Sequence, residues 1–165
     1  MEVVVSLHST RNTLAEAIRR KSVDLLSQSL VTAIDVQRQA KQAHWNVKGP
    51  NFIALHLLFD EVHTAAIEWA DLSAERLVAL GGTADGRVEH VADKTQLESY
   101  PLELTDGADH VRQLSAALAK YGQQTVAAIN ESGDAGDPST SDLFTEISRA
   151  VDDYLWKVEA HNYAK

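Results

Sequence analysis

Apolar residues recur along most of this chain at intervals of three and four, and the alternation typical of β-strands is missing. This spacing collects apolar side chains on one face of a helix, and that face must be buried against another helix. The chain has 165 residues, of which 44% are apolar, which fits one domain with a substantial core. The sequence therefore predicts an all-α protein.

Turn residues divide the periodic pattern into four long helices. The stretch "KGPN" and the pair Gly81 and Gly82 interrupt the first half, and "SGDAGDPSTSD" predicts a loop of about ten residues in the second half. Asp137 followed by Pro138 is typical of a helix start. The predicted helices span about residues 13–47, 51–80, 106–131 and 138–162, with a short helix near 88–97.

The lengths of the connections predict how these helices are arranged. The first and third connections are short, so each joins an antiparallel hairpin, whereas the long connection between the second and third helices must cross the length of the bundle. A four-helix bundle with one long crossover is the ferritin-like arrangement. We expect residues 13–165 to form this bundle, with the short helix on the crossover and a short N-terminal extension at residues 1–12.

Composition excludes several classes of protein. The chain has no cysteine, which removes disulfides, thiolate metal sites and thiol nucleophiles. No apolar run approaches the roughly 20 residues that span a bilayer, and "MEVVVSLHST" lacks the features of a signal peptide. These features predict a cytoplasmic protein with no membrane partner. A net charge of −9 does not favour nucleic acid but could attract cations.

The predicted second helix carries four potential metal ligands on one stripe: His56, Asp60, Asp71 and Glu75. At about 100° and 1.5 Å per residue they share a sector roughly 100° wide, but they form two i,i+4 pairs about 16 Å apart. Metal–ligand bonds are only about 2 Å long, so one ion cannot bridge both pairs of the same helix. The plain alternative is that these are core histidines and solvated acids.

The spacing of the two pairs suggests a site between subunits. Residues 56 and 75 share the midpoint 65.5 with residues 60 and 71, so a two-fold axis there would place each residue opposite its counterpart. His44 lies six residues before the turn near residue 50, and His56 lies six residues after it. In an antiparallel hairpin these two positions lie at the same height along the helix axes. Two imidazoles with carboxylates suit iron, manganese or zinc. The Glu-x-x-His motif of a di-iron site within one bundle is missing.

The segment "KQAHWNVKGPNFIALHLLFDEVHTAAIEWADLSAERLVALGG" resembles the signature region of the Dps proteins, or miniferritins, and the likeness extends through "SYPLEL" and "DYLWKVEAH". The resemblance implies a hollow homododecamer that oxidises Fe(II), preferably with hydrogen peroxide, stores the ferric mineral and protects against oxidative damage. It also implies which residues are the ferroxidase ligands. These are His44, His56 and Asp60 of one subunit, with Asp71 and Glu75 of its two-fold neighbour.

Two more residues near this centre have alternative interpretations. Trp45 corresponds to a tryptophan that the family is thought to use to intercept oxidising equivalents, and it could equally be a core anchor at a helix end. His63 mirrors Glu68 about position 65.5, which indicates an intersubunit His–Glu contact. The alternative for His63 is a site for an extra cation.

The resemblance also implies acidic pores on three-fold axes that admit iron. Asp134, Asp137 and Asp142 are the candidates, with Asp142 matching best, although Asp137 could instead be only a helix cap. DNA binding in the family commonly depends on a Lys-rich tail. The first ten residues here hold no Lys or Arg and the end "HNYAK" holds one, which predicts weak or absent DNA binding.

Three hypotheses follow, and they belong to different classes of protein. The first is a ferroxidase and iron store. The second is a nucleoid protein that compacts DNA and whose iron chemistry is incidental. The third is a structural bundle without metal.

Overall fold

The computed structural model describes residues 6–163. Over these residues it contains no β-strand, only an isolated bridge between Lys48 and Asp106. The all-α prediction is therefore confirmed. The helices are α1 (Glu16–Asn46), α2 (Phe52–Ala79), α3 (Val88–Lys94), α4 (Gly107–Ala135), α5 (Pro138–Glu159) and a single 3-10 turn, η1 (Ala160–Asn162).

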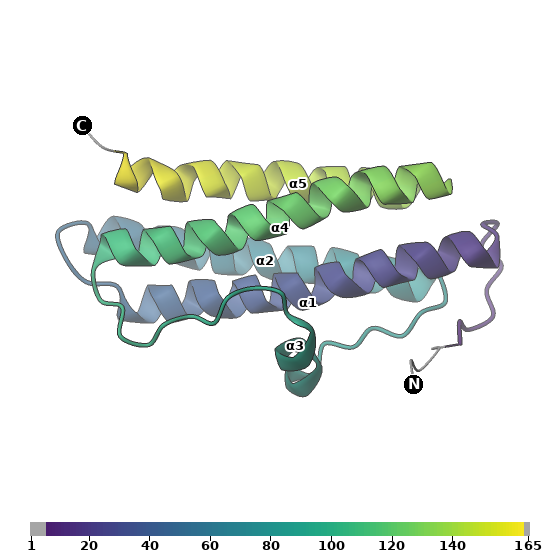
Figure 1. Ribbon diagram of the computed structural model, residues 1–165, viewed down its shortest axis with the longest axis horizontal. Coiled ribbons are helices and arrows are strands. Elements are labelled where there is room, and N and C mark those ends of the chain that lie inside the picture. The colour runs from purple at the N-terminus through teal and green to yellow at the C-terminus, as the bar shows by residue number, and fades with distance from the viewer. Residues whose placement is uncertain (1–5, 164–165) are drawn as a thin grey trace.

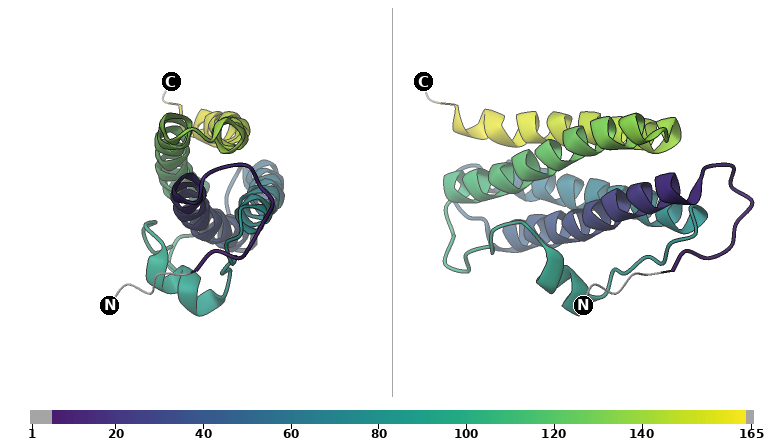
Figure 2. Two further views of the ribbon diagram at one scale, coloured as in Figure 1. Left: turned by 90° about the vertical axis from the view of Figure 1, so that its right-hand side faces the viewer. Right: turned by 45° about the vertical axis from the view of Figure 1, so that its right-hand side comes forward.

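The four long helices form two antiparallel hairpins that pack side by side (Figure 1). Helix α1 pairs with α2 and α4 pairs with α5, and α1 also packs against α4. The end-on view in Figure 2 shows the four helices as a bundle, with the crossover and α3 lying outside α1. This is the predicted ferritin-like arrangement, with one long connection that carries a short helix.

The link between α4 and α5 is much shorter than predicted. Helix α4 continues to Ala135, so only Gly136 and Asp137 separate it from α5. The polar composition suggested a loop, but the hydroxyl of Ser132 donates to the carbonyl of Ala128 within the helix (2.6 Å). Helix α4 ends where Gly136 adopts the left-handed conformation, with φ of 93°.

The part of the N-terminal extension around His8 is docked on the end of the first hairpin. The amide of His8 donates to the carbonyl of Gly81 (2.7 Å). Gly81 has φ of 93°, and a Cβ atom there would lie 2.6 Å from the His8 carbonyl oxygen, so only glycine fits. Helix α1 begins at Glu16, three residues later than predicted, because the Asn12 side chain accepts from the amide of Leu14 and forms a turn.

The core fills the space between the two hairpins. Large side chains such as Phe59, Tyr121 and Phe144 are fully buried there. The Tyr121 hydroxyl is hydrogen-bonded to Ser29 (2.8 Å), which also contacts Ser73 (2.9 Å), so these three buried hydroxyl groups are paired. The bundle centre is thus closed by packing and neutral hydrogen bonds, and the candidate metal ligands lie elsewhere.

Candidate metal centre

The antiparallel pairing of α1 with α2 brings His44 and His56 into contact. Their rings stack with centroids 3.7 Å apart. The Nδ1 atom of His44 donates to the His56 carbonyl (2.7 Å), and that of His56 donates to the His44 carbonyl (2.8 Å). Since a carbonyl only accepts, each Nδ1 carries a hydrogen, and in the neutral ring the lone pair is then on Nε2. This tautomer is the one that binds a metal through Nε2.

Asp60 lies one turn further along α2 and forms an ion pair with Lys41 of α1. The hydrogen bond from Lys41 lowers the pKa of Asp60 and outweighs partial burial, which raises it. In a single subunit, a lysine ammonium therefore lies where a metal ion would bind this carboxylate. Sequence reasoning missed Lys41. The hairpin arithmetic could have found it, because residues 41 and 60 lie nearly the same number of residues from the turn.

Asp71 and Glu75 are not brought to the other ligands within one chain. Both lie further along α2 and are exposed. Among residues 6–163 of a single subunit, no group of three or more His, Asp and Glu side chains is arranged to hold a metal ion. The imidazole and carboxylate groups are suitable metal ligands, but within one chain they form two separate groups: His44, His56 and Asp60 in one, and Asp71 and Glu75 in the other.

The same face of α2 exposes apolar side chains. Ile53, Leu57, Ile67 and Val78 are each between 41% and 62% exposed. Residues 53 and 78 share the midpoint 65.5 with the ligand pairs, and residue 67 mirrors Thr64. A helix face that combines exposed apolar residues with unfinished ligand pairs is typical of a subunit interface.

His63 continues the contact between α1 and α2. Its Nδ1 donates to the carbonyl of Gln37 (3.0 Å), so its Nε2 also keeps a free lone pair. Three contacts between α1 and α2 therefore follow one another along the helices: His44 with His56, Lys41 with Asp60, and Gln37 with His63.

Trp45 lies beside His44, but its ring is 58% exposed. The guanidinium of Arg38 lies over the ring, 5.9 Å from its centroid. The alternative that Trp45 is a core anchor is therefore wrong for the single subunit. A role in intercepting oxidising equivalents stays a prediction.

The three acidic pore candidates have different surroundings. Asp134 on α4 and Asp142 on α5 are exposed. Asp137 is 1% exposed and its carboxylate accepts from the Thr140 amide (3.0 Å), from Ser22 (2.7 Å) and from Arg76 (2.9 Å). Asp137 is thus a buried helix cap, and its assignment to a pore is corrected.

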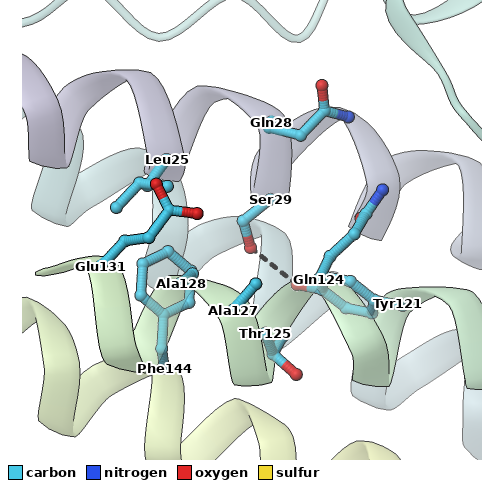
Figure 3. A pocket seen from close by; sticks show the side chains of 10 residues that line it. All are labelled: Leu25, Gln28, Ser29, Tyr121, Gln124, Thr125, Ala127, Ala128, Glu131 and Phe144. Carbon is cyan, nitrogen blue, oxygen red and sulfur yellow. Dashed lines mark hydrogen bonds between the residues drawn. The ribbon is translucent and has the colours of Figure 1, made fainter.

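A cavity of about 160 Å³ between α1, α4 and α5 is unsuited to metal (Figure 3). Its only carboxylate is that of Glu131, which forms an ion pair with Lys21. Ser29 and Tyr121, which both line the cavity, are hydrogen-bonded to each other. The candidate metal centre therefore lies on the α2 face and not in this cavity.

Comparisons with known proteins agree with the ferritin-like fold. The ferritin-like domain family matches residues 23–162. The DNA protection during starvation protein of Agrobacterium fabrum is 42% identical over 93% of this chain and 95% of its own length. The structure of Dps from Microbacterium arborescens in the high iron form has a TM-score of 0.84 at 31% identity, covering 94% of this chain and 98% of that one. DpsC from Streptomyces coelicolor has a TM-score of 0.93 at 27% identity, covering 97% and 94%.

Proposed function

Because the chain belongs to the Dps family of ferritin-like proteins, we propose that it is a ferroxidase and iron store. It oxidises Fe(II), preferably with hydrogen peroxide, at sites between subunits and keeps the ferric product inside a hollow homododecamer. The observation that carries this proposal is the histidine pair, His44 and His56, with both Nε2 atoms free beside Asp60.

Each ligand has a distinct task in holding Fe(II) as substrate. His44 and His56 supply neutral nitrogen donors whose orientation is set by their hydrogen bonds to backbone carbonyls. Asp60 supplies negative charge, and Lys41 must move away from it when iron binds. Asp71 and Glu75 of a second copy complete the site. Zinc or manganese could take the same ligands.

The overall reaction conserves atoms and charge. Two Fe(II) ions, one hydrogen peroxide and two water molecules give two FeO(OH) units and four protons. Both the oxidant and the free Fe(II) are consumed, which would protect the cell from oxidative damage. Asp134 and Asp142, which are exposed on either side of the α4–α5 link, are the candidates for the path that admits iron.

A nucleoid DNA-binding role is the competing proposal, since the Agrobacterium relative is named for DNA protection. The net charge of −9 favours the ferroxidase, because an acidic protein repels the phosphates of DNA. A cytoplasmic location fits either role.

Complementation between two single variants tests the shared site. Asp60→Asn and Asp71→Asn should each abolish rapid Fe(II) oxidation, because an amide keeps the shape but loses the charge that a divalent ion needs. In a mixed dimer, one end carries both substitutions and the other end is intact. Co-assembly should therefore restore about a quarter of the sites if chains pair at random, or about half if every dimer is mixed.

The measurement is the initial rate of Fe(II) oxidation, followed by absorbance after peroxide is added to anaerobically loaded protein. Two affinity tags on the two variants allow mixed shells to be purified and verified. Shells of each variant alone are the matched controls. No recovery in verified mixed shells, with a normal rate in the parent, would defeat the intersubunit site.

A further inference from the structure

Tyr100 and His110 form a hydrogen-bonded pair that the proposed iron site does not use. Tyr100 belongs to the crossover and His110 to α4, and the Tyr100 hydroxyl oxygen lies 2.6 Å from Nδ1 of His110. The two rings are stacked, with centroids 5.9 Å apart. His110 is 1% exposed, so the histidine side of this hydrogen bond has no contact with water.

The surroundings of the pair indicate that Tyr100 donates and His110 accepts. Among residues 6–163, His110 is the only hydrogen-bond partner of the Tyr100 hydroxyl, so the phenolic hydrogen is directed to Nδ1. Nε2 has no close hydrogen-bond partner, but the backbone carbonyls of Leu104 and Asn46 act on the ring and favour a hydrogen on the nitrogen that Tyr100 leaves free. Burial lowers the pKa of His110, so the ring is neutral near pH 7 and Nδ1 keeps its lone pair.

A phenol held against a neutral imidazole has a specific redox chemistry. Burial raises the pKa of Tyr100, so the hydroxyl keeps its proton while the ring is reduced. A phenol that loses one electron becomes a strong acid, and a base at hydrogen-bond distance takes its proton in the same step. Tyr121 lacks such a base, because its hydroxyl is bonded to the hydroxyl of Ser29.

The pair lies directly behind the candidate metal ligands. The Phe59 ring is 6.4 Å from the His110 ring, and Phe59 immediately precedes Asp60. On the other helix, Asn46, whose carbonyl acts on His110, follows His44 by two residues. Residues next to the ligands on both α1 and α2 therefore pack against the pair, and these packed groups give an electron a short path between Tyr100 and the ligand face.

We propose that Tyr100 gives one electron to the radical formed when peroxide meets a single Fe(II) ion, and that His110 accepts the phenolic proton. This inference rests on the proposed function, which supplies both Fe(II) and peroxide. The pair then stores one oxidising equivalent inside the subunit until a second Fe(II) ion arrives.

The electrons and protons of this sequence balance. One Fe(II) gives an electron to hydrogen peroxide, the O–O bond breaks, and Fe(III), hydroxide and a hydroxyl radical result. Tyr100 gives an electron to the hydroxyl radical, which becomes a second hydroxide, while the phenolic O–H bond breaks and an N–H bond forms at Nδ1 of His110. A second Fe(II) then reduces the tyrosyl radical, and the proton returns to the phenolic oxygen. The sum is two Fe(II) oxidised for each peroxide consumed.

Freeze-quenched electron paramagnetic resonance tests the proposal. The assembled protein is loaded anaerobically with less than one Fe(II) per subunit and mixed with hydrogen peroxide. The parent should give a radical signal that changes when the protein is grown with ring-deuterated tyrosine. Tyr100→Phe should lose this signal, because phenylalanine keeps the ring but has no hydroxyl. His110→Gln should lower the radical yield about tenfold or more, since a positioned base contributes roughly 10²- to 10⁴-fold to a rate.

Tyr121→Phe is the matched control, because it removes the hydroxyl of another buried tyrosine, one whose partner is not a base. It should keep the signal. Spin trapping is the second readout: Tyr100→Phe should release more trapped hydroxyl radical per Fe(II) oxidised than the parent or Tyr121→Phe. Sedimentation and circular dichroism verify each variant, and if His110→Gln does not assemble, Tyr100→Phe decides the test alone.

The rate of Fe(II) oxidation with excess Fe(II) separates the two proposals. If the parent oxidises Fe(II) rapidly but its tyrosyl signal is absent, or persists in Tyr100→Phe, the ferroxidase stands and the role of Tyr100 is overturned. If Tyr100→Phe lowers only the Tm and leaves both radical readouts unchanged, the pair merely fastens the crossover to α4 and the proposal is again overturned. If the parent does not oxidise Fe(II) rapidly, the proposed function fails and the Tyr100 inference fails with it.

Discussion

Two carboxylates, Asp60 and Asp137, each pair with a cation, but their surroundings give them opposite roles. Asp137 is 1% exposed and its oxygens are occupied by hydrogen bonds and by Arg76, so it ties α1, α2 and α5 together. Asp60 is partly exposed and its partner, Lys41, is on a flexible stem. A metal ion can displace Lys41 from Asp60 but has no access to the buried Asp137.

Replacing Lys41 by Met should strengthen metal binding at the centre. A partly exposed ion pair contributes only about 0.5–1 kcal/mol, so removing the competing ammonium should raise anaerobic Zn(II) affinity about two- to fivefold at neutral pH. The lysine also keeps the pKa of Asp60 low. Metal binding by Lys41→Met should therefore weaken at a higher pH than in the parent as the solution is acidified.

Calorimetric titration at several pH values measures both effects. Lys120→Met, which removes an exposed lysine from α4, is the control and should leave the affinity unchanged. Equal affinities for the parent and Lys41→Met across the pH range would mean that the Lys41 ion pair does not compete with the metal.

Asp137→Asn should destabilise the subunit by about 3 kcal/mol at neutral pH, because it leaves the charge of Arg76 uncompensated in a mostly buried position. Burial alone raises the pKa of Asp137, but the hydrogen bonds from Thr140 and Ser22 and the charge of Arg76 bring it below its usual 3.8. The stabilisation is therefore complete above about pH 3.8 and is lost as the pH falls through the lower, folded-state pKa.

Thermal unfolding as a function of pH tests this assignment. The gap in Tm between the parent and Asp137→Asn should be widest near neutrality and should narrow in acid. Asp24→Asn, at an exposed position on α1, should leave Tm nearly unchanged. A gap of constant size down to strongly acidic pH would contradict the role of the ionised carboxylate.

At the scale of helices, α2 has two faces with different tasks. One face buries side chains such as Phe59 and Trp69 in the bundle. The other exposes Ile53, Ile67 and Val78 next to the ligand pairs, and Ile53 and Val78 are symmetric about the midpoint 65.5. An exposed apolar stripe has no stabilising role in a single subunit, so we attribute it to pairing with a second α2.

Ile67→Arg should separate this pair, because residue 67 lies close to the proposed axis and two guanidinium groups would then face each other. The expected result is a smaller particle in sedimentation, with a loss of rapid Fe(II) oxidation and an unchanged helical content by circular dichroism. Val126→Arg, a similar change at a half-exposed position on α4, is the control for the added charge. A full-sized particle with normal oxidation would contradict pairing through α2.

At the scale of the whole molecule, the charge of the protein limits the classes of partner that it can bind. The chain carries a net charge of −9, and the basic residues near its start are engaged: Arg19 donates to the Leu80 carbonyl, and Lys21 pairs with Glu131. Across residues 6–163, no helix has the length and apolarity required to cross a bilayer. A protein with this net charge attracts cations and repels polyanions.

We predict that the assembled protein binds DNA weakly or not at all near physiological salt. Any retention in a gel shift at low salt should vanish when modest salt is added. A protein with few phosphate contacts binds DNA weakly, so even a shallow dependence of affinity on salt is enough to remove the binding. Retention of that kind would trace to Arg11, Arg19, Arg20 and Lys21. Tight retention that resists salt would contradict the prediction.

The sequence by itself determined the helices, the crossover and the pairing of His44 with His56. Periodic apolar residues define helix faces wherever the chain folds, and the short "KGPN" turn sets the register of the first hairpin. The mirrored ligand spacing on α2 is likewise a property of the sequence. These features depend on local geometry, so a helix of known pitch is enough to derive them.

Only the tertiary structure decided which polar residues are free. Asp137 is buried by Ser22 and Arg76, which lie far away in the sequence, while the neighbouring acid Asp134 is exposed. Trp45 is exposed although it is a large apolar residue at a helix end. Such outcomes depend on which distant helix packs against each side chain. Desolvation and hydrogen bonding are set by neighbours in space, and these neighbours cannot be identified from the local sequence.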